Sequence, residues 1–212
     1  MIARIRAAAL ACLSALALQA AVGAPAAHAA YPEQAIKLVV PFTPGGATDA
    51  VARLLANRLS GKLGQAVIVE NRPGASTVIG ANAVAQAQPD GYTLMLSGST
   101  TYTVLPALKR DLPYDPRRSF EHIAIVALAP VVLLAQNSVP AKTAQQAAAG
   151  GLVARQLGGL MYGTFGPGSA PHLVGEMFAE AAGAKMTPVP YKGSAQVIPP
   201  LTGRGNALGR DT

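Results

Sequence analysis

Short apolar runs and amphipathic stretches alternate along the chain. Three runs are apolar, as buried strands are: residues 36–40, 66–69 and 92–96. Two stretches between them have apolar positions at helical spacing: residues 49–60 and 79–86. We expect Gly61 to end the first helix, because glycine often follows the last helical residue. Strands that alternate with helices predict parallel βαβ units and an α/β fold.

The stretch at residues 160–183 repeats the order of elements found at residues 36–61. An apolar strand enters a glycine loop, an amphipathic helix follows, and a glycine closes it. The spacing also repeats, since Gly46 to Gly168 and Gly61 to Gly183 are both 122 residues (168 − 46 and 183 − 61). This echo predicts two similar α/β lobes, each with a glycine-rich helix N-terminus. Further apolar runs lie between them, at residues 123–128 and 131–135.

The two glycine loops are candidate anion sites. A helix N-terminus exposes unpaired N–H groups with a partial positive charge, and glycine lets a ligand approach the backbone. We therefore expect the loops to hold a small carboxylate in a cleft between the lobes. The alternative is that Gly45 and Gly46 form only a tight turn, with Thr48 or Asp49 as the helix cap. Two roles remain open for Asp49: to receive a ligand amino group, or to orient the amides of its own loop.

The second loop leaves similar alternatives open. His172 lies in the first turn of its predicted helix, where it either bonds a carboxylate or is a surface histidine. Thr164 and Ser169 cap the helix, bind ligand, or do both. Ser169 and His172 also raise a rival hypothesis, an enzyme of acyl or phosphoryl transfer. However, the sequence around Ser169 is G-P-G-S-A and lacks the G-x-S-x-G pattern of a nucleophile elbow.

The N-terminus has the pattern of a secretory signal peptide. A basic start with Arg4 and Arg6 precedes an apolar, alanine-rich segment and a small-x-small site, so we expect residues 1–29 to be removed after Ala29. The formal charge of +7 then falls to +5, and its scattered cations do not predict a nucleic-acid partner. The only cysteine, Cys12, lies in this segment, and we expect neither a metal nor a cofactor. No second apolar run approaches a membrane span, so we expect a soluble periplasmic protein.

Several motifs occur together in a characteristic order. They are P-G-G-x-x-D, E-N-R-P-G-A, D-G-Y-T-L, L-P-Y-D-P, Y-G-T-F-G-P-G-S-A-P-H-L and V-P-Y-K-G-S-A. Over residues 31 to about 195 the chain resembles the Bug-type substrate-binding receptors of tripartite tricarboxylate transporters. The resemblance implies a two-lobed receptor with a periplasmic-binding-protein-like fold. It implies a monomer without enzymatic activity that closes on a small organic carboxylate and delivers it to membrane transporter subunits.

The resemblance also implies which residues contact the ligand. The first-lobe loop contributes Thr43, Pro44, Gly45, Gly46, Thr48 and Asp49. The second-lobe loop contributes Thr164, Gly166, Gly168, Ser169 and His172. Two further segments match loops that reach the cleft, and from these we expect Ser97, Thr100, Thr101, Tyr191 and Lys192. The first lobe is expected at 30–133 and the second at 134–212, with the second lobe and the C-terminal return to the first incomplete.

Two features depart from the family pattern. Ser76 and Thr77 stand where relatives usually carry a small residue, often glycine. From about residue 196 the tail is atypical, and we expect Pro199 and Pro200 to break the helix found there in relatives. We interpret the chain as truncated or frame-shifted, with a naturally shortened member as the alternative. On that interpretation it is marginally stable and binds weakly, or is a non-functional fragment.

Overall fold

The computed structural model describes residues 31–136, 143–149, 160–183 and 185–202. The predicted signal peptide and the tail beyond residue 202 lie outside these ranges, so the structure does not test them. No helix within the described ranges is long and apolar enough to cross a membrane.

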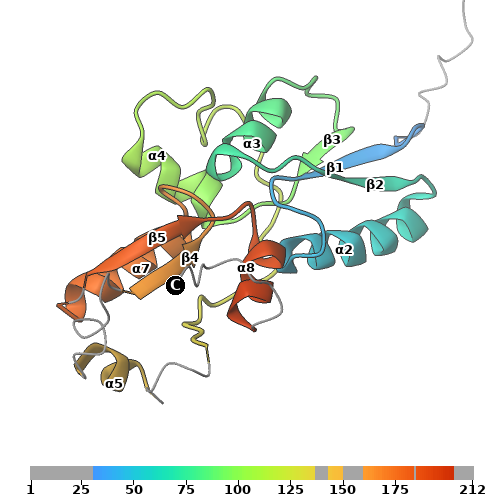
Figure 1. Cartoon of the computed structure of the whole chain (residues 1–212). Coiled ribbons are helices and arrows are strands. Elements are labelled where there is room, and N and C mark those ends of the chain that lie inside the picture. The colour runs from blue at the N-terminus through green and yellow to red at the C-terminus, as the bar shows by residue number, and fades with distance from the viewer. Residues whose placement is uncertain (1–30, 137–142, 150–159, 184, 203–212) are drawn as a thin grey trace, which may run out of the picture. The chain divides into compact units, whose positions relative to one another are not determined.

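The first sheet has three parallel strands in the order β2-β1-β3 (Figure 1). They are β1 (Ile36–Val40), β2 (Val67–Asn71) and β3 (Thr93–Met95), so all three predicted strands are present. The central strand β1 is buried at four of its five positions because it has a neighbour on each side. Its register places Ile36 opposite Val67 and Lys37 opposite Thr93.

Helix α2 (Ala47–Leu63) packs its small residues on this sheet. The buried core consists of Ile36, Leu38, Val40, Ala52, Ala56 and Val67. Gly61 lies inside the helix, so the prediction that it ends the helix is wrong. The helix is capped instead by Gly64, whose left-handed φ of 69° lets its N–H reach the Ser60 carbonyl at 3.1 Å. The second predicted helix is α3 (Val78–Ala85), which contacts β1 and β3.

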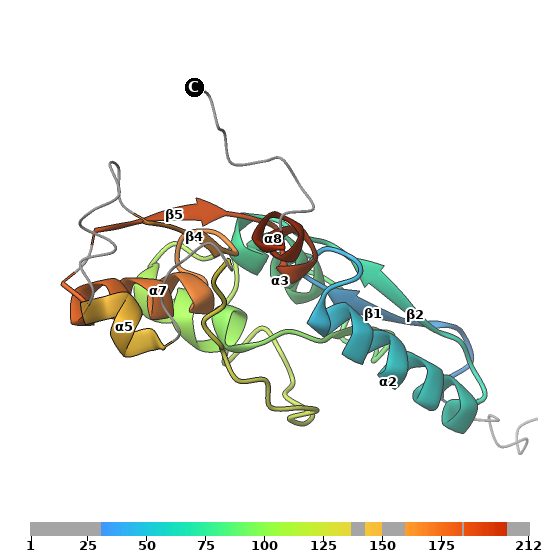
Figure 2. The ribbon, with the colours of Figure 1, turned by 60° about the horizontal axis from the view of Figure 1, so that its bottom comes forward.

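A second parallel pair is formed by β4 (Leu160–Thr164) and β5 (Met186–Pro190). Helix α7 (Ala170–Ala181) connects the two strands and contacts both (Figure 2). The predicted echo is therefore present as two β–loop–α–β units. The constant spacing of 122 residues between glycines does not carry over to the helix ends, because α2 has 17 residues and α7 has 12.

The remaining elements are short. They are a 3₁₀ turn (Ala75–Thr77), a π-helical turn (Thr100–Val104), α4 (Leu105–Leu108), α5 (Ala144–Ala149) and α8 (Ser194–Leu201). Helix α8 contains both Pro199 and Pro200, so the expectation that they break it is wrong. They lie in its last turn, where each lacks the N–H that would bond the carbonyl four residues earlier, and the helix ends at Leu201.

The apolar runs at residues 123–128 and 131–135 form neither helix nor strand. Their side chains are exposed, with exposed fractions of 80% at Ile123, 83% at Ile125 and 89% at Leu128. The lobe boundary expected between residues 133 and 134 falls at this segment and stays a prediction.

Candidate functional site

The loop between β1 and α2 presents an uncapped helix N-terminus. Gly45 has a φ of 79°, which favours glycine, whereas Gly46 is extended with a φ of −83°. Gly46 is the N-cap residue and has no side chain to accept a hydrogen bond from the first-turn N–H groups. Thr48 and Asp49 lie inside the first turn, so the alternative that one of them is the cap residue is wrong. Pro44 and Gly45 are exposed, whereas Gly46 is buried.

The first-turn amides of α2 are only partly paired. The Ala47 N–H donates to Ser194 Oγ at 3.3 Å. In the part of the chain that the structure describes, the N–H groups of Thr48 and Asp49 have no hydrogen-bond partner. Unpaired amides at a helix start carry the positive end of the helix dipole, which attracts an anion.

The N-terminus of α8 contacts this loop through Ser194. A Cβ on Gly46 would stand 2.9 Å from Ser194 Oγ and 3.7 Å from the Ala195 nitrogen. The Thr43 N–H donates to the Lys192 carbonyl at 3.3 Å. Like α2, α8 has a glycine N-cap, Gly193, without a side-chain cap bond. Two helix N-termini thus converge at one place, which concentrates positive potential there.

One hydroxyl at this junction has no partner. Thr43 Oγ1 is buried and makes no hydrogen bond among the described residues. It lies beside Gly193, where an added Cβ would approach it to 2.7 Å. A buried hydroxyl without a partner is costly, and it is a donor that a bound oxygen would satisfy.

Asp49 is fully engaged with the protein. The residue is 3% exposed, and its carboxylate accepts hydrogen bonds from Gly45 N, Arg53 Nε and Asn71 Nδ2, each at 2.9 Å. The hydrogen bond from Arg53, with those from Gly45 and Asn71, lowers the pKa of Asp49 to about 2 against the opposing effect of burial. Of the two roles left open for Asp49, the geometry matches the orientation of its own loop.

The second glycine loop is closed on itself. Ser169 caps α7 and its Oγ accepts from His172 N at 3.4 Å and Phe165 N at 3.2 Å. Thr164 Oγ1 is buried and accepts from Gly166 N at 3.2 Å. The amides expected to receive an anion are therefore already paired within the loop, which the sequence did not indicate.

His172 is also paired within the protein. Its Nδ1 accepts from Gly168 N at 3.5 Å, and its Nε2 lies 3.8 Å from Glu176 Oε1. Its ring stacks on Tyr162, whose hydroxyl donates to Glu176. Burial and this carboxylate raise the pKa of Tyr162. Among the described residues no hydrogen bond joins the His172 ring to Ser169 Oγ, so the structure does not form the nucleophile–base pair of the rival hypothesis.

The polar segment at residues 97–101 reaches the second loop. Thr100 Oγ1 accepts from Ala170 N in the first turn of α7, at 3.0 Å. Thr101 is buried and shares hydrogen bonds with Ser97 Oγ at 2.5 Å and Thr77 Oγ1 at 2.8 Å. These residues hold loops together in the structure, and a role in binding ligand remains a proposal.

Residues 75–77 form a left-handed turn that sequence reasoning missed. Ala75, Ser76 and Thr77 have φ values of 47°, 55° and 86°. Ser76 Oγ donates to the Pro167 carbonyl at 2.9 Å, which ties the turn to the second glycine loop. Positive φ at non-glycine residues gives no composition signal. The one available hint was that relatives usually carry a small residue here.

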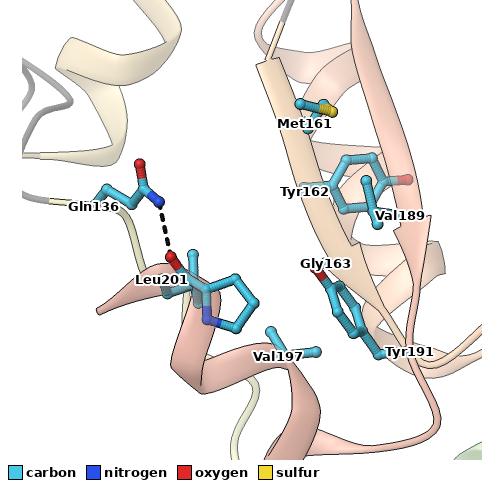
Figure 3. A pocket seen from close by; sticks show the side chains of 9 residues that line it. Gln136, Met161, Tyr162, Gly163, Val189, Tyr191, Val197 and Leu201 are labelled. Carbon is cyan, nitrogen blue, oxygen red and sulfur yellow. Dashed lines mark hydrogen bonds between the residues drawn. The ribbon is translucent and has the colours of Figure 1, made fainter. Parts of the chain in front are cut away.

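Tyr191 and Lys192 have different surroundings. Tyr191 lines a small apolar pocket between β4–β5 and α8 (Figure 3). The other lining residues are Gln136, Met161, Tyr162, Gly163, Val189, Val197, Pro200 and Leu201. None of them belongs to the β1–α2 loop, so this pocket is distinct from the α2–α8 junction. Lys192 is exposed, and its N–H donates to Gln196 Oε1 at 3.0 Å.

Within the described residues no group of three His, Cys, Asp or Glu side chains is placed to hold a metal.

Comparison with known proteins adds a family match. The model described as "Tripartite tricarboxylate transporter family receptor" matches residues 51–207. A UPF0065 protein of Bordetella pertussis is 40% identical over 174 residues, covering 82% of this chain and 53% of that protein. Protein BugT of the same organism is 39% identical over 190 residues, covering 87% and 56%. The chain spans about half the length of the curated relatives it matches.

Solved structures show the same relationship. MatC of Rhodopseudomonas palustris with bound malate has a TM-score of 0.74 at 32% identity, covering 81% of this chain and 57% of that one. The periplasmic binding protein BugD has a TM-score of 0.69 at 35% identity, covering 81% and 56%. An R. palustris protein with adipate has a TM-score of 0.68 at 33% identity, covering 81% and 57%.

Proposed function

The chain belongs to the tripartite tricarboxylate transporter receptor family, and on that premise we propose that it is an extracytoplasmic receptor for a small organic carboxylate. It has the α/β periplasmic-binding-protein-like fold of its solved relatives. The carboxylate is bound at the α2–α8 junction and delivered to a membrane transporter. Malate and adipate, bound by two of the solved relatives, are the first ligands to test.

One observation carries this proposal: two uncapped helix N-termini converge beside an unpaired hydroxyl. Each terminus stabilises an anion by about 0.3–1 kcal/mol at an exposed site. Two such termini supply on the order of 1–2 kcal/mol, against the roughly 8 kcal/mol of a micromolar complex. The junction therefore orients one carboxylate, and contacts elsewhere on the ligand supply most of the affinity.

The test is calorimetric titration of the purified protein with malate and adipate, in wild type and two variants. Gly46→Val introduces a Cβ 2.9 Å from Ser194 Oγ and separates the two termini. Gly61→Ala is the matched control, since nothing lies within 4 Å of a Cβ there. We expect the control to bind as wild type does and Gly46→Val to lose binding while still melting cooperatively. Unchanged affinity in Gly46→Val, or no binding of any mono-, di- or tricarboxylate by wild type, contradicts the proposal.

A further inference from the structure

The Asp49 carboxylate connects three segments that meet at the α2–α8 junction. It receives one hydrogen bond from the β1–α2 loop at Gly45, one from α2 at Arg53 and one from the end of β2 at Asn71. Both carboxylate oxygens are used, and the side chain is 4% exposed. The carboxylate is therefore engaged by the protein on both oxygens.

Asn71 extends the same network to the start of the loop. Its Nδ2 donates to the Phe42 carbonyl at 3.1 Å as well as to Asp49 Oδ1. Its Oδ1 accepts from Arg53 Nη2 at 3.3 Å. The loop is thus tied at both ends, at Phe42 through Asn71 and at Gly45 through Asp49. The residues between these two ties are Thr43 and Pro44, and Thr43 has the unpaired hydroxyl.

The charge of Asp49 needs compensation, because a carboxylate in the first turn of α2 repels a ligand anion. Arg53 supplies it through an ion pair of 2.9 Å one helical turn away. Asp49 and Arg53 together are neutral, so the helix dipole and the free amides of Thr48 and Asp49 still favour an anion.

We propose that Asp49 is a positioning residue of the carboxylate site, which holds the Phe42–Gly45 segment so that Thr43 and the first-turn amides of α2 face the ligand. This inference rests on the proposed function. It assigns Asp49 no contact with the ligand, in contrast to the ligand role expected from the family resemblance.

The first test needs no ligand. In Asp49→Asn one acceptor oxygen becomes an NH₂ donor, so the network loses at least one hydrogen bond. We expect the Gly45 amide proton to exchange about tenfold faster or more, the effect of losing one hydrogen bond to a charged group. Glu70→Gln is the matched control because it removes the same charge one residue from Asn71, in an exposed cluster with Lys37 and Arg72. We expect it to leave Gly45 exchange unchanged.

The second test measures affinity for malate and adipate in the same proteins. We expect about a tenfold or larger loss in Asp49→Asn and none in Glu70→Gln. If Asp49→Asn does not fold, Asn71→Ala replaces it as the test variant. This substitution releases Phe42, and we expect the same loss of affinity. Wild-type Gly45 exchange in Asp49→Asn overturns the inference, as does faster exchange in that variant with unchanged affinity. If wild type binds neither acid, the proposed function fails, while the exchange rate of Gly45 still decides whether Asp49 holds the loop.

Discussion

Two glycines near the end of α2 have opposite conformations. Gly61 is helical and has open space around the position of a Cβ, whereas Gly64 has a φ of 69° and its N–H closes the last turn on Ser60. Glycine inside a helix costs conformational entropy, but at a left-handed cap it is the best residue.

We therefore expect Gly61→Ala to stabilise the protein by about 0.5–1 kcal/mol and Gly64→Ala to destabilise it by about 1 kcal/mol. Urea denaturation followed by circular dichroism measures both free energies of unfolding. Equal effects of the two substitutions contradict the assignment of Gly64 as the cap.

Strain at a single residue gives a second prediction. Ala75 has a φ of 47° and an exposed side chain, so it combines an unfavourable backbone conformation with few contacts. Glycine adopts this conformation without steric cost. We expect Ala75→Gly to stabilise by about 0.5–1 kcal/mol, after the greater entropy of glycine in the unfolded chain is counted. A lower melting temperature in calorimetry counts against a strained turn.

At the scale of elements, the sequence predicted those that repeat a simple period. The β1–α2–β2 and β4–α7–β5 units follow from apolar runs and helical spacing. The left-handed turn at residues 75–77 could not be predicted, because three non-glycine residues adopt it only under tertiary contacts such as that from Ser76 to Pro167.

The candidate site was predicted in part. The residues of both glycine loops were identified from helix N-terminus and glycine signals. The difference between the loops was not, because it depends on partners distant in sequence. Ser194 reaches Ala47 across 147 residues, and Thr100 pairs with Ala170 across 70. Hydrogen bonds at such separations leave no local pattern.

The first turn of α2 is sensitive to acid. The pKa of Asp49 is lowered from 3.8 to about 2, first by its hydrogen bond from Arg53. A lowered pKa contributes stability that is present above the unfolded value near 3.8 and is lost as pH falls toward 2. The contribution is on the order of 1–2 kcal/mol, reduced by solvent screening of the half-exposed Arg53.

Asp49→Asn removes this titration. We expect the free energy of unfolding to fall less steeply between pH 4.5 and about 2 in the variant than in wild type. Guanidinium chloride denaturation at several pH values measures the two slopes. Identical slopes show that the carboxylate is not stabilised in its ionised form.

At the scale of the whole molecule, the exposed apolar side chains at residues 123–134 have the largest consequence for behaviour in solution. Ile125 and Leu128 are 83% and 89% exposed in a segment without helix or strand. Exposed contiguous apolar surface promotes association.

We expect wild type to associate with rising concentration and the double variant Ile125→Lys, Leu128→Lys to associate less. The two positions contribute little to the fold, so stability should change by no more than about 0.5 kcal/mol. Sedimentation velocity over a concentration series measures the association, with the exposed Leu54→Lys on α2 as the control. A larger effect of the control than of the double variant contradicts this prediction.

The most direct test of the carboxylate site is a titration of ¹⁵N-labelled protein with malate and adipate, followed by amide chemical shifts. This measurement detects weak binding and reports each loop separately. Sodium chloride at matched ionic strength controls for screening. We expect the largest shifts at Gly46, Thr48, Asp49 and Ala195 and smaller ones at Gly166 and Ala170, whose amides are already paired. Shifts confined to the second loop, or none beyond the salt control, contradict a carboxylate site at the α2–α8 junction.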